Sequence, residues 1–389
     1  MSHILPREWV AELGDLHDKA KEIPMDEVMR VIHSELGRPC EEVFADFDHR
    51  AVASASIAQV HAATLHTGER VAVKVQKPAV GVQNWCDLQV YWLVLFALEI
   101  VFDLPLVWTY EFTKQQLEKE LDFRIEAENG RKCALALKPQ FGDSVLVPRV
   151  FDSVSSRRVL VCEWVDCCAQ IHDVKHLVGQ GWDLRAVMRR GIEIFGFQIF
   201  ADGNVHCDPH PGNLLVRHHP RRKGDFQLVL LDHGLYTELP PTLREQYSLF
   251  WVSMWLRDLE TMKTCSKAWG VRDTEFFASA TLLKSFKSLL RPSAGPGSGA
   301  YKRPRTTAEM AAFQEKLKER ARQVLHDTSA FPRELLFVGR TMNIIRAENF
   351  ALGSAVDRVA VLAECAMAAR GSGWRDRASM RLSVWALQA

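Results

Sequence analysis

The spacing of apolar residues changes along the chain and predicts both helices and strands. Residues 25–36 carry apolar side chains at every third or fourth position, as one face of an amphipathic helix does. Residues 60–65 and 70–76 instead alternate, which is typical of two strands joined by a turn at 66–69. The same criteria predict further helices at 85–102, 112–137 and 184–200, and further strands at 145–150, 158–164, 214–216 and 228–231.

The order of these elements predicts an α+β fold with two lobes. The pattern is helical from residue 239 onward, apart from a segment at 291–307 that is rich in Pro, Gly, Ser and basic residues and reads as a flexible linker. We therefore expect an N-terminal helical extension at 1–50, a small strand-rich lobe at 51–165, and a helical lobe with polar loops at 166–389.

One apolar stretch, 88–108, is long enough to be considered as a membrane span. It contains Glu99, Asp103 and Pro105, and a carboxylate near the centre of a bilayer costs about 2.5–3.5 kcal/mol on insertion scales. The charges favour a helix buried in the protein core. A membrane-spanning or membrane-facing helix is the alternative.

Composition is that of a globular protein that does not bind nucleic acid. The 389 residues are 47% hydrophobic and 25% charged, and the formal net charge of +1 supplies no field that would attract nucleic acid. Nine cysteines without a Cys-x-x-Cys pair argue against zinc and favour a reducing compartment. The first residues show neither a secretory signal nor a transit peptide, and begin as if inside a longer protein.

The second predicted strand carries a lysine that suits phosphate binding. Lys74 ends the sequence Val-Ala-Val-Lys and faces away from the valine side of the strand, as in the third strand of kinases. Such a lysine needs a carboxylate from a helix, and Glu126 is the candidate. Either residue alone is more readily explained as part of a solvated surface.

A polar loop at 206–213, with the sequence HCDPHPGN, is more specific. The spacing from Asp208 to Asn213 matches a kinase catalytic loop, in which the aspartate orients or deprotonates the attacking hydroxyl and the asparagine binds a metal ion. Two prolines and a glycine between them suggest a stiff loop. The alternative is a polar surface turn, against which the apolar elements on both sides argue.

An aspartate follows the apolar strand at 228–231 and precedes a glycine by two positions. Asp232 thus stands where the Asp-x-Gly motif of kinases binds Mg²⁺, which favours carboxylate and amide oxygens. His233 occupies the position that is usually Phe, and we interpret it as a packing residue instead of a metal ligand or catalytic group.

The segment that would cover the nucleotide lacks glycine. Ala53, Ser54, Ala55, Ser56 and Ile57 directly precede the hairpin that carries the lysine, where a kinase would have a glycine-rich loop. Alanine does not readily adopt positive φ, so this loop should be stiffer than its glycine counterpart.

A further nucleotide contact is predicted at the end of the apolar strand 158–164, at Glu163. Together these candidates describe a site for ATP and Mg²⁺.

These stretches together resemble the AarF/UbiB family of atypical kinases, from about residue 5 to about residue 256. The resemblance rests on Ser54–His61, Val71–Gln76, Glu120–Phe123, His206–Asn213 and Leu231–Tyr236. It implies a protein-kinase-like fold, with Lys74 on ATP, Glu126 as its partner, Asp208 as the catalytic residue, and Asn213 and Asp232 as Mg²⁺ ligands. It also implies a mitochondrial, membrane-associated setting and a link to isoprenoid or coenzyme Q lipids.

The chain departs from the family pattern in three ways. The family's Lys-x-Gly-Gln motif, which packs near the Glu-x-Asp motif (here Glu120 and Asp122), is missing. The family's Ala-Ala-Ala-Ser reads Ala-Ser-Ala-Ser at 53–56. The Ala-Pro-Glu segment that anchors the peptide platform of ordinary kinases is also absent, which argues against protein phosphorylation.

Three functions remain open on the sequence. The favoured one is an Mg-ATP-dependent phosphotransferase or ATPase acting on a lipid-like small molecule. The second is a pseudokinase that binds nucleotide without turnover, and the third is a protein serine/threonine kinase.

Overall fold

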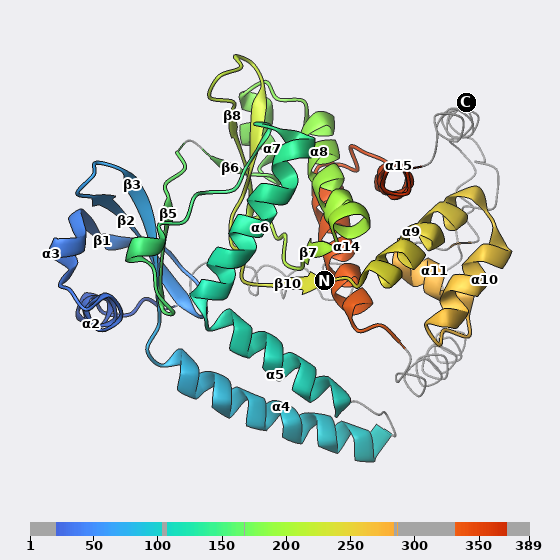
Figure 1. Ribbon diagram of the computed structural model, residues 1–389, viewed down its shortest axis with the longest axis horizontal. Coiled ribbons are helices and arrows are strands. Elements are labelled where there is room, and N and C mark those ends of the chain that lie inside the picture. Colours follow the sequence, from blue (N-terminus) through green and yellow to red (C-terminus); the bar gives the residue numbers. More distant parts are fainter. Residues whose placement is uncertain (1–20, 103–106, 167, 284–285, 287–330, 372–389) are drawn as a thin grey trace. The chain divides into compact units, whose positions relative to one another are not determined.

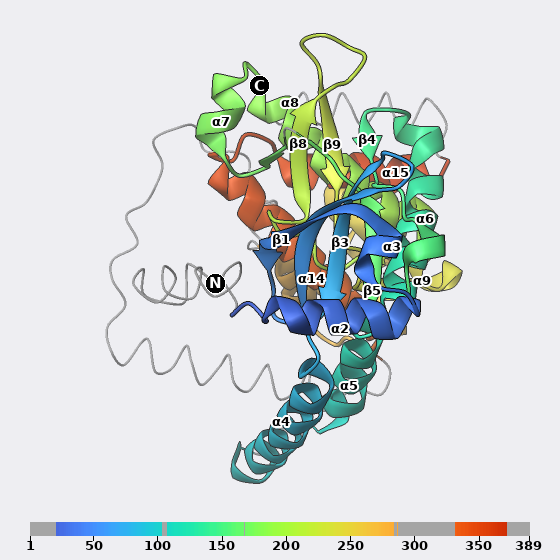
Figure 2. The same ribbon diagram turned by 90° about the vertical axis from the view of Figure 1, so that its left-hand side faces the viewer.

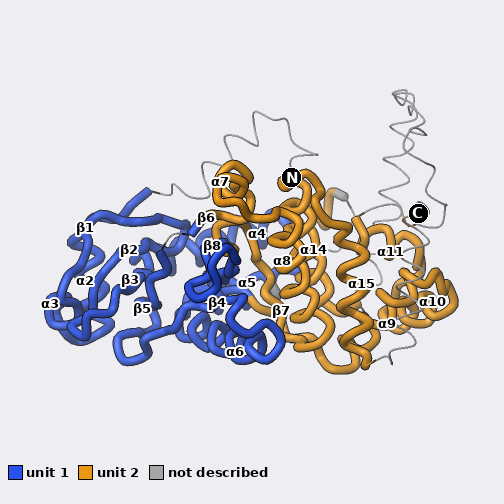
Figure 3. The backbone as a smooth tube through the Cα atoms, turned by 90° about the horizontal axis from the view of Figure 1, so that it is seen from above, with its two compact units in different colours: residues 1–97, 107–168, 215–235 blue, residues 98–106, 169–214, 236–389 orange. Residues whose placement is uncertain are grey.

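The computed structural model describes residues 21–102, 107–166, 168–283, 286 and 331–371. The chain divides into two compact units (Figure 3). Unit 1 comprises residues 1–97, 107–168 and 215–235, and unit 2 comprises residues 98–106, 169–214 and 236–389. The predicted linker at 291–307 lies outside the described residues.

Unit 1 is built on a four-stranded antiparallel sheet with the order β1-β2-β3-β5. Its strands are β1 (Phe44–Ser54), β2 (Ala58–Leu65), β3 (Arg70–Gln76) and β5 (Val159–Glu163). The strand β1 was not expected from the sequence, because its polar and exposed residues lack a clear alternation. Its first residues lie within 1–50, where we expected a helical extension.

The helix α2 (Met25–Leu36) covers the valine side of this sheet. Its residues Val28, Val31 and Ile32 are buried in one cluster with the three valines of β3. The short helix α3 (Cys40–Val43) adds its two ends to the same cluster. With the valines directed into this core, alternation places Lys74 on the opposite side of β3.

Three helices follow β3: α4 (Val80–Phe102), α5 (Trp108–Glu120) and α6 (Phe123–Phe141). The single helix predicted at 112–137 is therefore two helices. Asp122 separates them, because its side chain accepts a hydrogen bond from the backbone N–H of Arg124 and so caps α6.

The helix α4 is exposed, so the expectation that it is buried in the core is wrong. Only 11% of its most apolar window is buried. Leu88 and Leu95 are covered, whereas Trp85 is 63% exposed and Ile100 is 68% exposed. Figures 1 and 2 show α4 beside α5, directed away from the sheet of unit 1, and the Tyr91 hydroxyl lies 3.2 Å from that of Thr109. A charge count does not reveal this, because α4 is apolar all round and lacks a face that identifies its surroundings.

Unit 1 also includes residues 215–235, which are far along the chain from its first four strands. The strand β9 (Phe226–Leu230) pairs in parallel with β4 (Val145–Leu146), and β8 (Leu214–His218) lies next to β9. Residues 215–235, which we expected in the helical lobe, thus belong with unit 1. The aspartate after β9 therefore lies in the same unit as the lysine of β3.

Unit 2 is mainly helical. The helix α8 (Leu184–Phe197) continues into a π-helix at Gln198–Asp202, and the strands β7 (Asn204–His206) and β10 (Tyr236–Glu238) pair antiparallel. Its other elements are β6 (Ala169–Gln170), α7 (Val174–Gly179), α9 (Pro241–Leu256), α10 (Leu259–Ala268), α11 (Thr274–Leu282), α14 (Glu334–Ala351) and α15 (Arg358–Ala369).

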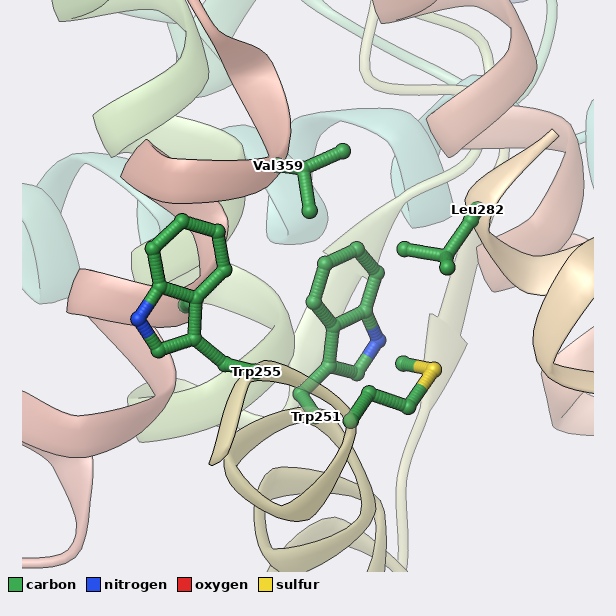
Figure 4. A pocket seen from close by; sticks show the side chains of 6 residues that line it. Trp251, Trp255, Leu282 and Val359 are labelled. Atoms are coloured by element: carbon green, nitrogen blue, oxygen red, sulfur yellow. The ribbon is translucent and has the colours of Figure 1, made fainter. Parts of the chain in front are cut away.

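The helix α15 packs against α8 and α9. It approaches α8 closely, since a Cβ built on Gly196 would lie 2.7 Å from the Sγ of Cys365. A small pocket beside α9 is lined by apolar and aromatic side chains, including Trp251, Trp255 and Leu282 (Figure 4). It contains none of the residues singled out by the sequence, so it belongs to the core of unit 2.

Candidate nucleotide site

Three of the predicted site residues meet in unit 1. The Nζ of Lys74 lies 2.9 Å from both carboxylate oxygens of Glu126 and 3.0 Å from Oδ2 of Asp232. The sequence motifs predicted that Glu126 pairs with Lys74 and that Asp232 belongs to the same nucleotide site. The structure brings all three together, from β3, from α6 and from the end of β9.

The fold fixes Glu126 firmly. It lies in the first turn of α6, which Asp122 caps, and only 6% of the residue is exposed. Phe123, on the same turn, is fully buried and places its ring centroid 5.1 Å from the Nζ of Lys74. The ammonium group is thus held by a carboxylate and an aromatic face, an arrangement that stabilises a charged lysine.

Burial and neighbouring charges set the protonation of this cluster. Burial alone lowers the pKa of Lys74, but the carboxylates of Asp232 and Glu126 outweigh it and raise that pKa. Burial raises the pKa of Glu126, and the negative charge of Asp232 adds to the rise against the opposing effect of Lys74. Lys74 therefore stays charged, and Glu126 takes up a proton at a higher pH than an ordinary glutamate does.

Asp232 is held in a backbone conformation that is rare for a residue other than glycine. Its φ is +51°, in the left-handed region. Its Oδ1 accepts a hydrogen bond of 3.0 Å from the N–H of Gly234, and its Oδ2 contacts Lys74. The side chain is nevertheless 42% exposed. The turn after β9 thus presents a carboxylate toward solvent at a fixed position.

His233 packs into unit 1 beside Asp232. The residue is 7% exposed, and its ring lies against α6, where a Cβ on Gly130 would meet it at 3.3 Å. Asn129 donates a hydrogen bond of 2.9 Å to its carbonyl oxygen. Burial lowers the pKa of His233 to about 4. The ring is therefore neutral near pH 7 and serves packing, as the sequence interpretation holds.

The Ala/Ser segment lies at the end of β1 and in the turn to β2. The backbone N–H of Ala55 donates to the carbonyl of Ala58 at 2.9 Å, and Ser54 is buried while Ala53, Ala55 and Ser56 are exposed. Ala53 and Ser54 thus end β1, and Ala55 and Ser56 lie in the turn that leads into β2.

Lys77 fastens this turn, a role that the sequence gave no reason to expect. Its Nζ donates to the carbonyl of Ala55 at 2.6 Å and to the carbonyl of Lys21 at 2.9 Å. Its backbone N–H donates to the carbonyl of Ile57 at 2.9 Å. A lysine next to a strand end carries no pattern that indicates backbone partners. Lys77 thus holds the glycine-free turn through the backbone carbonyls of Ala55 and Ile57.

Glu163 does not join the cluster around Lys74. It lies at the end of β5 opposite Val71, whereas the register partner of Lys74 on that strand is Leu160. Its carboxylate accepts a hydrogen bond of 3.3 Å from the backbone N–H of Arg149. The nucleotide contact predicted for Glu163 stays a prediction.

The catalytic-loop candidate lies in unit 2 and is stabilised by its own backbone. The carbonyl of Asp208 accepts hydrogen bonds from the N–H of His210 at 2.8 Å and from Nδ2 of Asn213 at 3.1 Å. The N–H of Asn213 donates to the carbonyl of His210 at 2.8 Å. These bonds fix the spacing between Asp208 and Asn213, as the two prolines led us to expect.

A residue of α14 contacts this loop. The Nη2 of Arg340 lies 3.0 Å from Oδ1 of Asp208. The neighbouring Thr341 donates from its hydroxyl to the carbonyl of His206 at 2.9 Å. Sequence reasoning missed Arg340, because it lies in an ordinary helix far along the chain from the loop.

Asp232 in unit 1 and Asn213 in unit 2 each carry an oxygen of a kind that Mg²⁺ favours. Asn213 is 8% exposed and uses its amide nitrogen within the loop, which leaves the amide oxygen as the atom able to face a cation. Asp232 presents a carboxylate. A carboxylate and an amide oxygen, completed by phosphate oxygens and water, are the ligands that Mg²⁺ favours.

Comparison with known proteins shows the family to which this chain is similar. The model of the "ABC1 atypical kinase-like domain" matches residues 15–266. The "ABC1 family protein lscO" of Purpureocillium lilacinum is 34% identical over 99% of this chain and 70% of its own length. The "Probable serine/threonine-protein kinase abkD" of Dictyostelium discoideum is 34% identical over 94% of this chain and 51% of its own length.

An animal relative and a solved structure agree with these matches. The "AarF domain-containing protein kinase 1" of Gallus gallus is 32% identical over 90% of this chain and 66% of its own length. The sequence motifs resemble those of the animal AarF domain-containing kinases numbered one and five, with a preference for five, and the Gallus gallus relative is the kinase numbered one. The structure of a Mycobacterium tuberculosis protein, Rv3197 with erythromycin, covers 94% of this chain at a TM-score of 0.55 and 19% identity, with 88% of its own length matched. The predicted α+β, kinase-like fold is confirmed.

Proposed function

Because this chain belongs to the family of ABC1 atypical kinase-like proteins, we propose that it is an Mg-ATP-dependent phosphotransferase or ATPase. The observation that carries the proposal is the contact of one lysine with two carboxylates: Lys74 with Glu126 and Asp232. A kinase needs its phosphate-binding lysine aligned by a helix carboxylate, and it needs a second carboxylate for the metal ion. Both requirements meet at one ammonium group.

In this proposal each residue has one task. Lys74 binds the α- and β-phosphates, and Glu126 aligns it. The oxygen of a hydroxyl group or water forms a bond to the terminal phosphorus, the bond from that phosphorus to the ADP oxygen breaks, and Asp208 accepts the proton from the attacking oxygen. Asp232 and Asn213 would hold Mg²⁺, which would neutralise part of the phosphate charge.

Two other functions have specific support. The glycine-free turn, which Lys77 fastens, favours a pseudokinase that binds nucleotide without turnover. The name of the Dictyostelium relative favours a protein serine/threonine kinase, but the sequence lacks the Ala-Pro-Glu segment that supports a peptide substrate. Turnover is favoured because the sequence contains all four residues that it requires: Lys74, Asp208, Asn213 and Asp232. The absence of a peptide platform favours a small-molecule acceptor over a peptide substrate.

The acceptor and the setting are inferred from the family resemblance and from α4. We propose a lipid-like or isoprenoid acceptor, in mitochondrial lipid or coenzyme Q related metabolism. A chain that modifies such a molecule benefits from contact with the membrane in which the molecule is dissolved.

The helix α4 offers the surface for that contact, and we propose a lipid bilayer as its occupant. By length and composition Val80–Val101 could cross a membrane, and most of it is uncovered. Its 22 residues extend about 33 Å, close to the roughly 30 Å hydrocarbon thickness. A helix that is apolar all round needs either a protein core or lipid around it, and the described residues supply no core.

ATP binding and hydrolysis, measured with and without Mg²⁺, test the enzymatic proposal. Asp208→Asn should keep nucleotide affinity and reduce turnover by about 10²-fold or more, because proton transfer is lost. Asp232→Asn should remove the Mg²⁺ dependence of binding. Hydrolysis that survives unchanged in Asp208→Asn contradicts its role, and tight binding without turnover under any condition supports the pseudokinase. Lipid vesicles added to the assay should stimulate turnover if the acceptor is membrane-borne.

A further inference from the structure

The candidate catalytic loop lacks a cation of its own. Between Asp208 and Asn213 the sequence is Pro-His-Pro-Gly, with neither lysine nor arginine. Phosphoryl transfer spreads negative charge over the oxygens of the transferred group, and positive groups close to those oxygens stabilise it. Lys74 serves the α- and β-phosphates in the proposed function. A positive side chain from outside the loop is therefore the candidate to contact the transferred group.

Arg340 is placed to supply it. Its Nη2 lies 3.0 Å from Oδ1 of Asp208, within unit 2. The contact follows from the way in which α14 is attached to the loop. The hydroxyl of Thr341, which is fully buried, donates to the carbonyl of His206 at 2.9 Å, and His206 is 1% exposed. The next residue of the helix thereby presents its guanidinium to the aspartate.

Stability does not account for this ion pair. The side chain of Arg340 is 51% exposed and that of Asp208 is 32% exposed. Ion pairs exposed to this extent contribute about 0–1 kcal/mol to folding. The guanidinium is an exposed group that is aimed at a catalytic carboxylate, and it remains accessible to a ligand.

We propose that Arg340 binds the terminal phosphoryl group of ATP while it orients Asp208. A guanidinium has five N–H donors in a planar fork, so one edge can hold a carboxylate while another donates to phosphate oxygens. The inference rests on the proposed function and adds to it a residue that contacts the transferred group. Bond making and breaking are those of the step above: Asp208 receives the proton, ADP leaves, and Arg340 only donates hydrogen bonds.

The affinity for ATP relative to ADP tests the inference without requiring turnover. Affinities of the full chain for a non-hydrolysable ATP analogue and for ADP are measured by calorimetry in the presence of Mg²⁺. Arg340→Gln should weaken binding of the analogue about tenfold or more, as the loss of a charge-assisted hydrogen bond does, and should leave ADP binding within about twofold. Arg340→Lys should lie in between, because lysine keeps the charge and loses the fork.

A matched control removes the same charge from the same helix. Arg333, an exposed arginine at the beginning of α14, replaced by Gln should change neither affinity. Thermal unfolding midpoints that agree among wild type, Arg340→Gln and Arg333→Gln show that folding is intact.

A double variant separates contact with phosphate from action through Asp208. If Arg340 only neutralises Asp208, Arg340→Gln has no effect in an Asp208→Asn background; if it contacts the phosphoryl group, the loss of analogue binding persists there. Equal weakening of ATP analogue and ADP, or a loss that vanishes in that background, overturns the inference.

Turnover distinguishes this inference from the proposed function. If wild type hydrolyses ATP, Arg340→Gln should slow hydrolysis by about 10³-fold, the scale seen for arginines on a transferred phosphoryl group. Faster hydrolysis would show that Arg340 is an inhibitory latch and would overturn the inference. If wild type shows no turnover, the enzymatic proposal fails, and the ratio of the two affinities still decides the role of Arg340.

Discussion

His233 sits beside the candidate metal ligand with its ring buried against α6. Burial of the neutral ring lowers its pKa from the usual 6.5 to about 4. Between these two values the unfolded chain binds a proton at His233 and the folded chain does not. Stability from this residue is therefore fully present above about pH 6.5 and is lost as the pH falls toward 4.

Replacing His233 by Phe should flatten the acid dependence of stability. The difference of about 2.5 pKa units corresponds to about 3 kcal/mol of the free energy of unfolding, lost between pH 7 and pH 4. Urea denaturation at pH 7 and pH 5 measures it. His233→Phe should show a smaller drop than wild type, and His66→Phe, at an exposed turn, should match wild type. Because burial also lowers the pKa of His61, part of the drop persists in every variant. Equal drops in the two variants would contradict the assignment.

Individual residues were predictable where their chemistry is tied to a short pattern. Lys74, Glu126 and Asp232 each stand at a recognisable position in a strand, a helix or a strand end, and the structure brings them together. Lys77 and Arg340 were not predictable, because their partners are backbone carbonyls or a distant carboxylate. Such contacts depend on the folded arrangement and leave no spacing in the sequence.

At the scale of elements, the spacing of apolar residues predicted that a helix exists better than it predicted whether the helix is buried or exposed. The helix α2 has a clear apolar stripe, and its predicted bounds match the structure. The helix α4 has no stripe, and its carboxylates favoured burial although the structure leaves it exposed. The predicted helix at 112–137 is interrupted because a capping aspartate gives α6 its own beginning.

Polar substitutions on α4 should weaken binding to vesicles. Wild type should float with phosphatidylcholine vesicles in a density gradient, and a variant with Trp85, Val90 and Leu93 replaced by Ser should float less, because it loses three exposed apolar side chains that would enter lipid. The control replaces three exposed apolar residues of other helices, Val178, Leu256 and Leu336, by Ser and should float like wild type. If wild type fails to float, or the α4 variant floats equally, α4 does not bind lipid.

At the scale of the whole molecule, the sequence predicted the fold class, and the predicted domain boundaries stay a prediction. The order of strands and helices gave an α+β kinase-like protein. The assignment of residues 215–235 to unit 1 depends on the parallel pairing of β9 with the two-residue strand β4. A strand of that length has no period of its own.

Hydrogen exchange should show that one nucleotide acts on both units. If Lys74 and Asp208 serve the same ATP, Mg-ATP should slow amide exchange in β3 of unit 1 and in residues 204–213 of unit 2, since a ligand lowers the population of open states. Exchange in α10 should stay unchanged, and Asp232→Asn should remove the effect that depends on Mg²⁺. Protection confined to one unit would mean that the two sets of residues do not share a nucleotide.

Lys74 and Lys77 differ in the kind of group that their ammonium groups contact. Lys74 is held by carboxylates, which titrate, whereas Lys77 is held by peptide carbonyls, which do not. Mild acid therefore acts on them unequally. Protonation of Glu126 removes one of the two carboxylates that contact the phosphate-binding lysine and leaves Asp232 as its remaining partner, while the hydrogen bonds from Lys77 to peptide carbonyls are unchanged. An acidified sample should therefore keep the fastened turn and contain a lysine that is aligned by one carboxylate instead of two.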